Sequence, residues 1–157
     1  KKAYQIRELS RNIKLAHTSI LIYLKELQKN NLIKKEKVGV YNAYIANFED
    51  ESFRFYKKIA NMVNLKESGI IKELENKLTP DAIVLFGSYS KGEDTEKSDI
   101  DIFLIAKEKK IELTRYEKKL NRKIQLFFSE DIGKLPKELQ NNVLNGLILS
   151  GFLRWKT

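Results

Sequence analysis

Apolar residues in the middle of the chain follow strand periodicity on both sides of a short small-residue turn. An unbroken apolar run covers Ile83 to Phe86 and stops at Gly87, which predicts a strand buried on both faces and then a tight turn. Further along, Ser98 to Ile102 alternates strictly between polar and apolar residues. This alternation predicts that Asp99 and Asp101 leave a second strand on the same face. We therefore expect a strand, turn, short helix and strand in which two carboxylates converge.

The pattern continues beyond this unit. A helix is predicted over 111–121 and a third strand over 122–129. On this strand, alternation places Lys123, Gln125 and Phe127 on one face. Two helices are predicted next, over 129–135 and 136–149, and the second of them is expected to cover the sheet. Trp155 follows in a basic tail, where packing on an edge and contact with a partner both remain open.

The N-terminal third shows helical spacing followed by two short strands. A short helix and a turn are predicted from Tyr4 to Ala16, and a longer helix covers Thr18 to Asn30, in which apolar residues recur at spacings of four and three. Asn31 suits a left-handed end to that helix. Residues 32–37 and 40–45 then predict a hairpin with a basic outer strand.

Two helices connect the halves of the chain. Their apolar residues predict helices over 48–65 and 66–78, broken near 64–69, whose aromatic side chains are expected in the core. A domain boundary is expected between Asp50 and Lys66. The fold class is therefore α+β, in three segments: 1–48 with helices and a hairpin, 49–78 as a helical connector, and 79–157 as a domain with a short sheet.

Composition narrows the class of protein. The chain has 157 residues, of which 42% are hydrophobic and 32% charged, as in soluble globular domains. No apolar run approaches the roughly 20 residues that span a bilayer, so no membrane association is expected. Cysteine is absent and there is one histidine, which excludes disulfides and thiolate metal sites and favours a cytoplasmic location. The first residues, Lys1-Lys2, are not a natural start, so we expect the true N-terminus to lie upstream.

Positive charge is concentrated in the N-terminal third. Residues 1–48 contain ten Lys and Arg against three acids, a net charge of +7, whereas residues 49–157 contain twenty against eighteen, or +2, which together give the chain's +9. Such an asymmetry predicts a module that binds nucleic acid or another polyanion.

The paired carboxylates have a chemistry of their own. Two acids side by side repel one another unless a cation lies between them. Mg²⁺, or Mn²⁺, takes oxygen ligands from one or two carboxylates together with substrate phosphates. A glycine followed by a serine at the start of a helix lets backbone N–H groups and a hydroxyl approach an anion.

Gly87-Ser88, a spacer and Asp99-Ile100-Asp101 after an apolar strand resemble the signature of the nucleotidyltransferase superfamily, and Ser88 to Gly92 resembles its minimal prokaryotic members. The resemblance implies a nucleotidyltransferase fold, with a short mixed sheet flanked by helices. It also implies that Asp99 and Asp101 hold divalent metal, that Gly87 and Ser88 bind the phosphates of a nucleoside triphosphate such as ATP, and that Lys91 offsets their charge. The implied activity is transfer of a nucleoside monophosphate to an acceptor.

One departure affects this expectation. Superfamily enzymes usually carry a third carboxylate on the strand predicted at 122–129, and the matching position here is Gln125. A neutral amide removes one negative charge from a site meant for up to two divalent ions. Binding of the second metal and activation of the acceptor hydroxyl are therefore in question.

The N-terminal third resembles the second half of a winged helix-turn-helix, with the usual first helix upstream or missing. This resemblance implies that the start of the second helix enters the DNA major groove and that the wing contacts phosphate. The matching groove residues are His17, Thr18, Ser19, Leu21 and Ile22, and the matching wing residues are Lys34, Lys35 and Lys37. Because Leu21 and Ile22 are apolar where base-reading versions are polar, binding of a protein, or of a second copy, is an equal alternative.

Two functions of other classes therefore remain open. One is a DNA-binding transcriptional regulator whose nucleotidyltransferase domain senses nucleotide or only scaffolds, because Gln125 has removed catalysis. The other is an antitoxin-like partner of a helical HEPN protein, since minimal nucleotidyltransferases often act in such pairs. Salt-dependent binding to duplex DNA would favour the regulator, whereas nucleotide incorporation that depends on Asp99 and Asp101 would favour the enzyme.

Overall fold

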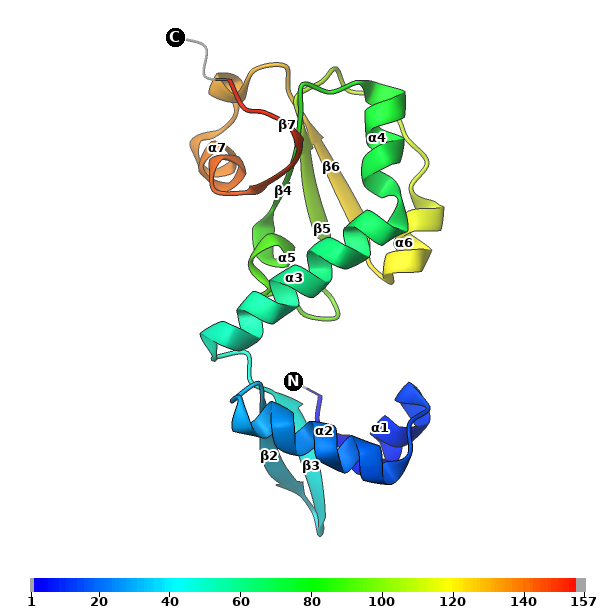
Figure 1. The fold of residues 1–157 in the computed structure, drawn as a ribbon. Coiled ribbons are helices and arrows are strands. Elements are labelled where there is room, and N and C mark those ends of the chain that lie inside the picture. The colour runs from blue at the N-terminus through cyan, green and yellow to red at the C-terminus, as the bar shows by residue number, and fades with distance from the viewer. Residues whose placement is uncertain (1, 155–157) are drawn as a thin grey trace. The chain divides into compact units, whose positions relative to one another are not determined.

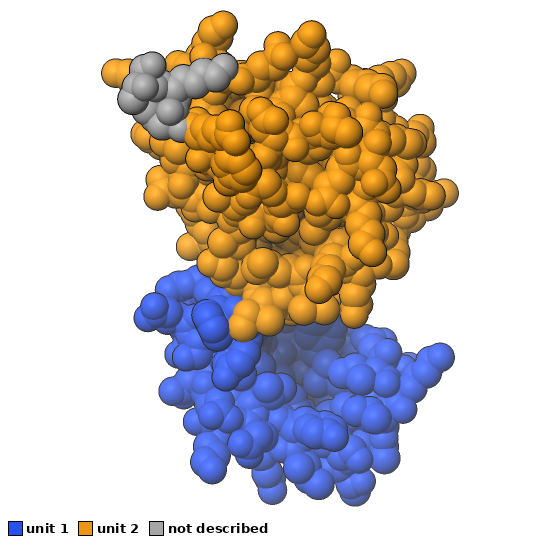
Figure 2. All heavy atoms as spheres, turned by 45° about the horizontal axis from the view of Figure 1, so that its top comes forward, with its two compact units in different colours: residues 1–56 blue, residues 57–157 orange. Residues whose placement is uncertain are grey.

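The computed structural model describes residues 2–154, so Trp155 lies outside the described residues. The chain divides into two compact units, residues 1–56 and residues 57–157 (Figure 2). The division falls inside one long helix. Each unit has a sheet and a hydrophobic core of its own. Among the helices of the described part, none combines the length and the apolar character needed to cross a membrane.

The first unit is a three-stranded antiparallel sheet with two helices. Its strands lie in the order β1-β3-β2. Ile20 and Leu24 of the second helix are buried against Tyr44 of β3, which accounts for the predicted apolar stripe. The elements are β1 (Tyr4–Gln5), α1 (Ile6–Ile13), α2 (His17–Lys29), β2 (Ile33–Val38) and β3 (Tyr41–Ala46).

Most local predictions for this unit are confirmed. Asn31 has a φ of 56° just after α2, and β2 and β3 form the predicted hairpin in the register Val38 to Tyr41. The helix predicted to begin at Tyr4 is wrong at its start. Tyr4 is in a strand because it pairs with Tyr44 of β3, a partner 40 residues away that no local pattern indicates.

The second unit is built on a four-stranded mixed sheet. The strand order is β6-β5-β4-β7, in which β5 and β6 are parallel and the other pairs are antiparallel. The elements are α3 (Glu51–Ser68), which begins in the first unit, α4 (Ile70–Leu78), β4 (Ala82–Phe86), α5 (Gly87–Lys91), β5 (Ile100–Leu104), α6 (Thr114–Leu120), β6 (Ile124–Phe128), the 3-10 turn η1 (Ile132–Lys134), α7 (Lys137–Leu144) and β7 (Leu147–Gly151).

Helices cover both faces of this sheet (Figure 1). On one face, Leu65 of α3, Leu74 of α4 and Tyr116 of α6 pack on the buried isoleucines and leucines of β4 and β5. On the other face, Val143 of α7 packs on a smaller cluster that contains Phe86 and Phe103. Alternation along β5 thus sends Ile100 and Ile102 into the first core, as predicted, and leaves Asp101 on the same face as Phe103 of the smaller cluster.

The last element of the described residues is a strand where a helix was predicted. The helix predicted over 136–149 ends at Leu144, and residues 147–151 instead pair with β4 at the edge of the sheet. Gly146 makes this possible, because a Cβ atom there would lie 2.6 Å from Cγ1 of Val84. The leucines of this segment are spaced to fit either periodicity, and the free edge of β4 decides the outcome.

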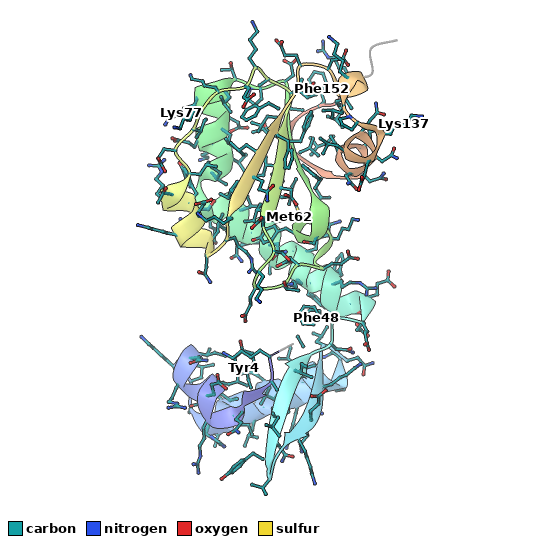
Figure 3. The ribbon with its side chains drawn as sticks, turned by 180° about the vertical axis from the view of Figure 1, so that it is seen from behind. Tyr4, Phe48, Met62, Lys77, Lys137 and Phe152 are labelled. Carbon is teal, nitrogen blue, oxygen red and sulfur yellow. The ribbon has the colours of Figure 1, made fainter. Side chains whose placement is uncertain are left out.

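The apolar residues of α3 are a second correction. Tyr56 was predicted to lie in the core with the other aromatic side chains, yet it is 58% exposed. Ile59 and Val63, at the same helical spacing, are 43% and 47% exposed. Met62, labelled in Figure 3, lies on the same helix and is also exposed. The residues of α3 that are buried are instead Asn61, Leu65 and Ser68, two of which are polar.

Candidate active site

The turn after β4 and the start of β5 form the centre of the site. Gly87 has a φ of 71°, a backbone conformation that favours glycine. A Cβ atom on Gly87 would overlap the Oδ2 atom of Asp101, so the absence of a side chain lets this carboxylate lie against the turn. Antiparallel pairing of Phe86 with Asp101 fixes that approach. The structure therefore brings the predicted glycine turn and one predicted carboxylate into contact.

Asp99 joins this group through the third strand. Gln125 pairs with Asp101 in the parallel register of β5 and β6, so both side chains leave the same face of the sheet. The amide Nε2 of Gln125 donates a hydrogen bond of 2.5 Å to Oδ2 of Asp99. The two aspartates and Gln125 therefore lie together at the end of the sheet where β5 and β6 begin.

The negative charge of Asp101 is disfavoured by its surroundings. Its side chain is half-buried, and burial, followed by the negative charge of Asp99, raises the pKa of Asp101 above its ordinary value. A carboxylate in this position is stabilised by any cation that lies between it and Asp99. The electrostatics of the two carboxylates therefore favour a cation at this position.

The remaining predicted residues of this site lie on α5. Ser88 is half-buried in the first turn of the helix, and Lys91 is exposed in its last turn. The hydroxyl of Ser90 donates to the carbonyl oxygen of Gly87 at 2.8 Å, which holds the turn in place. Gly92, with a φ of 71°, ends the helix.

A buried ionic cluster beside the turn was not predicted. The side chain of Asp94 is 1% exposed, and its two carboxylate oxygens contact Lys57 Nζ at 3.0 Å and Arg122 Nη2 at 3.2 Å. Asn61 donates to Asp94 Oδ1 at 2.7 Å and to the carbonyl oxygen of Tyr89 at 2.9 Å. The cluster ties α3, α5 and the start of β6 to the loop that leads to Asp99. Asp94 lies in a strongly charged stretch of sequence, which is typical of a solvated loop, so no local signal indicates its burial.

The predicted nucleic-acid-binding residues belong to the first unit. His17 and Thr18 are exposed and Ser19 is half-buried in the first turn of α2, while Lys34, Lys35 and Lys37 are all exposed on β2. Of the two apolar groove positions, Leu21 is half-buried and Ile22 is 66% exposed. These residues form no part of the group around Gly87.

The donor set around Gly87 fits a hard divalent cation. It consists of two carboxylates that repel one another, beside a turn that leaves space only for a residue without a side chain. Mg²⁺ needs one or two protein carboxylates when substrate phosphates complete its coordination. Within residues 2–154, no group of three or more His, Cys, Asp or Glu side chains is placed to hold a metal ion. Asp99 and Asp101 are the two carboxylates that lie beside this turn.

A short mixed sheet, with a Gly-Ser turn after one strand and an Asp-x-Asp pair at the start of the next, is the arrangement of the nucleotidyltransferase fold. A model of the family described as polymerase beta, nucleotidyltransferase matches residues 68–150, which is more than half of the 157 residues, and the chain belongs to this family as a minimal nucleotidyltransferase. The match runs from the last residue of α3 into β7 and so includes the turn, strands β4 to β6 and all of β7 except Gly151. No curated protein and no solved structure matches the chain significantly.

Proposed function

We propose that this protein transfers a nucleoside monophosphate from a nucleoside triphosphate to an acceptor hydroxyl, with a divalent ion held by Asp99 and Asp101. The observation that carries the proposal is the contact between Asp101 and the turn at Gly87, with Asp99 beside it. When bound, Mg²⁺ would neutralise phosphate charge and polarise the phosphorus. Because the family is one of nucleotidyltransferases, the chemistry follows from the family, and the choice of ligands is our proposal.

The chain's own residues position the triphosphate. Gly87 lets the backbone approach the phosphates, Ser88 offers a hydroxyl, and Lys91 supplies a positive charge at the end of α5. Burial, followed by the charge of Asp99, raises the pKa of Asp101, and a cation beside it would act in the opposite direction. Such a site acts by positioning and charge neutralisation. A cytoplasmic location is part of this proposal, because nucleoside triphosphates and Mg²⁺ are both supplied there.

Transfer of label tests this function. The purified protein is incubated with each of four α-labelled nucleoside triphosphates, Mg²⁺, and either protein or RNA fractions as acceptors. We expect labelled product with the wild type and a loss of at least about 100-fold in Asp99→Asn and Asp101→Asn. Glu108→Gln is the matched control, since it removes one acid from an exposed loop after β5. Equal labelling by the wild type and both aspartate variants would refute the assignment.

A second candidate function is binding of duplex DNA by the first unit, and the placement of the β2 lysines favours it. Lys35 pairs with Tyr44, which packs on α2, so Lys35 and Lys37 lie on the helix side of the hairpin. Lys34 lies on the opposite side, where its Nζ is 2.7 Å from Oε2 of Glu49. Two lysines therefore lie on the same face of the sheet as the helix whose first turn would enter the groove.

Titration of DNA at several salt concentrations tests this second function. Each phosphate contact that is lost reduces the salt slope by about one, so the double variant Lys35→Ala/Lys37→Ala should lower the slope by about two. Lys34→Ala, the control on the opposite side, should change it much less. If the wild type shows no salt-dependent binding, Ile22, which is 66% exposed, would favour a protein partner such as a HEPN protein or a second copy.

A further inference from the structure

Gln125 is a neutral side chain beside two carboxylates, and its amide already makes a hydrogen bond to one of them. Its Nε2 atom donates to Oδ2 of Asp99 at 2.5 Å, and its Cα is paired with that of Asp101. Since an ionised carboxylate accepts hydrogen bonds only, the amide must present its nitrogen to Asp99 and its oxygen elsewhere. The group nearest Asp99 on β6 is therefore a hydrogen-bond donor where a metal site needs an acceptor.

We propose that Gln125 limits this site to a single divalent ion and orients Asp99 to hold it. The proposal rests on the proposed function and adds the number of ions and a positioning role for one residue. A ligand carboxylate is usually held by a further hydrogen bond, and a donor at 2.5 Å performs that task here. The same hydrogen bond occupies an oxygen of Asp99 that would otherwise be available to a second ion.

Charge supports the limit of one ion. Two divalent ions about 3.5–4 Å apart need bridging oxygens and enough negative charge to offset their repulsion. Asp99 and Asp101 supply two negative charges, and in the described part of the chain no further acid, histidine or cysteine completes a group of three with them. Two carboxylates match one divalent ion, with phosphate oxygens as its remaining ligands.

The cation just before this strand does not replace the amide of Gln125 as the partner of Asp99. Lys123 precedes β6, and its Nζ atom lies 2.9 Å from Oε2 of Glu117 on α6. The same glutamate accepts the backbone N–H of Ile124 at 3.1 Å, which keeps this pair beside α6. The group that contacts Asp99 from this strand is thus Gln125.

Counting bound Mn²⁺ tests the proposal without measuring activity. The full chain is titrated with Mn²⁺ in the presence of a non-hydrolysable nucleoside triphosphate analogue, and bound ions are counted by electron paramagnetic resonance. The wild type should bind one ion per chain. Gln125→Glu should bind two, with the line broadening of a coupled Mn²⁺ pair. Gln125→Met, which keeps the size and removes the donor without adding charge, should bind one ion several-fold more weakly.

The outcomes separate this inference from the proposed function. Two ions in the wild type, or one in a folded Gln125→Glu variant, would overturn the inference and leave the proposed function intact. No bound ion and no bound nucleotide in the wild type would overturn both. Circular dichroism checks that each variant is folded, which is expected because Gln125 is exposed.

Discussion

Replacement of Asp94 by asparagine removes the negative centre of the buried ionic cluster. The carboxylate is 1% exposed, and its partners Lys57 and Arg122 are 19% and 16% exposed, so neither cation is well solvated in the folded protein. Asparagine keeps the size of the side chain and one carbonyl oxygen, while Lys57 and Arg122 no longer face a carboxylate. The expected effect is therefore electrostatic and involves almost no change of packing.

The magnitude follows from this geometry. Removal of one partner from a buried ion pair costs about 3–5 kcal/mol, because the remaining charge stays buried without compensation. In a domain of this size each kcal/mol lowers the melting temperature by several degrees, so Asp94→Asn should lower it by on the order of 10 °C or more. Urea unfolding followed by circular dichroism measures the free energy of unfolding directly.

A neighbouring acid provides the control. Glu93→Gln removes the same charge from an exposed side chain one residue earlier, and it should change the free energy of unfolding by less than about 0.5 kcal/mol. Asp94→Leu combined with Lys57→Met and Arg122→Met should recover much of the stability lost in Asp94→Asn, because apolar residues can replace a buried ionic group. An Asp94→Asn protein as stable as Glu93→Gln would refute the reasoning.

Three further predictions concern the turn, the carboxylates and the last strand. Gly87→Ala should abolish binding of a metal–nucleotide complex in calorimetry, whereas Gly39→Ala, which has a similar positive φ but open surroundings, should cost about 1–2 kcal/mol and leave binding unchanged. Because the pKa of Asp101 is raised in the folded state, Asp101 binds a proton at pH values between its ordinary and its raised pKa, where the unfolded state does not. Stability should therefore rise as pH falls through the raised value, and Asp101→Asn should remove this rise in thermal melts. Gly146→Ala should destabilise the protein by about 1–3 kcal/mol in urea unfolding, because the added methyl overlaps Val84.

The parts of the fold that were predictable are those in which the signal is local. Alternation at 98–102 and the apolar run at 83–86 correctly predicted which side chains of β5 face the core and which face the turn. The end of α2 at Asn31 and the hairpin were also predictable, since turn-forming residues mark them. In each case one short segment determines its own conformation.

The remaining features depend on partners far away in the sequence. β7 is a strand because β4 has an unpaired edge, and β1 is a strand because β3 does. Asp94 is buried because Lys57 and Arg122, from two other segments, reach its carboxylate. The helical spacing of apolar residues in α3 indicates only that they share one face of the helix. It does not indicate whether that face is buried, and here it is exposed.

The central claim is that Asp99 and Asp101, beside the turn at Gly87, hold a divalent ion together with a nucleotide. Calorimetric titration of the full chain with each nucleoside triphosphate, in Mg²⁺ and again in a chelator, tests it most directly. The account predicts one bound nucleotide per chain in Mg²⁺, no binding in the chelator, and no binding by Asp99→Asn/Asp101→Asn. Nucleotide binding of equal strength in the chelator, or in the double variant, would contradict it.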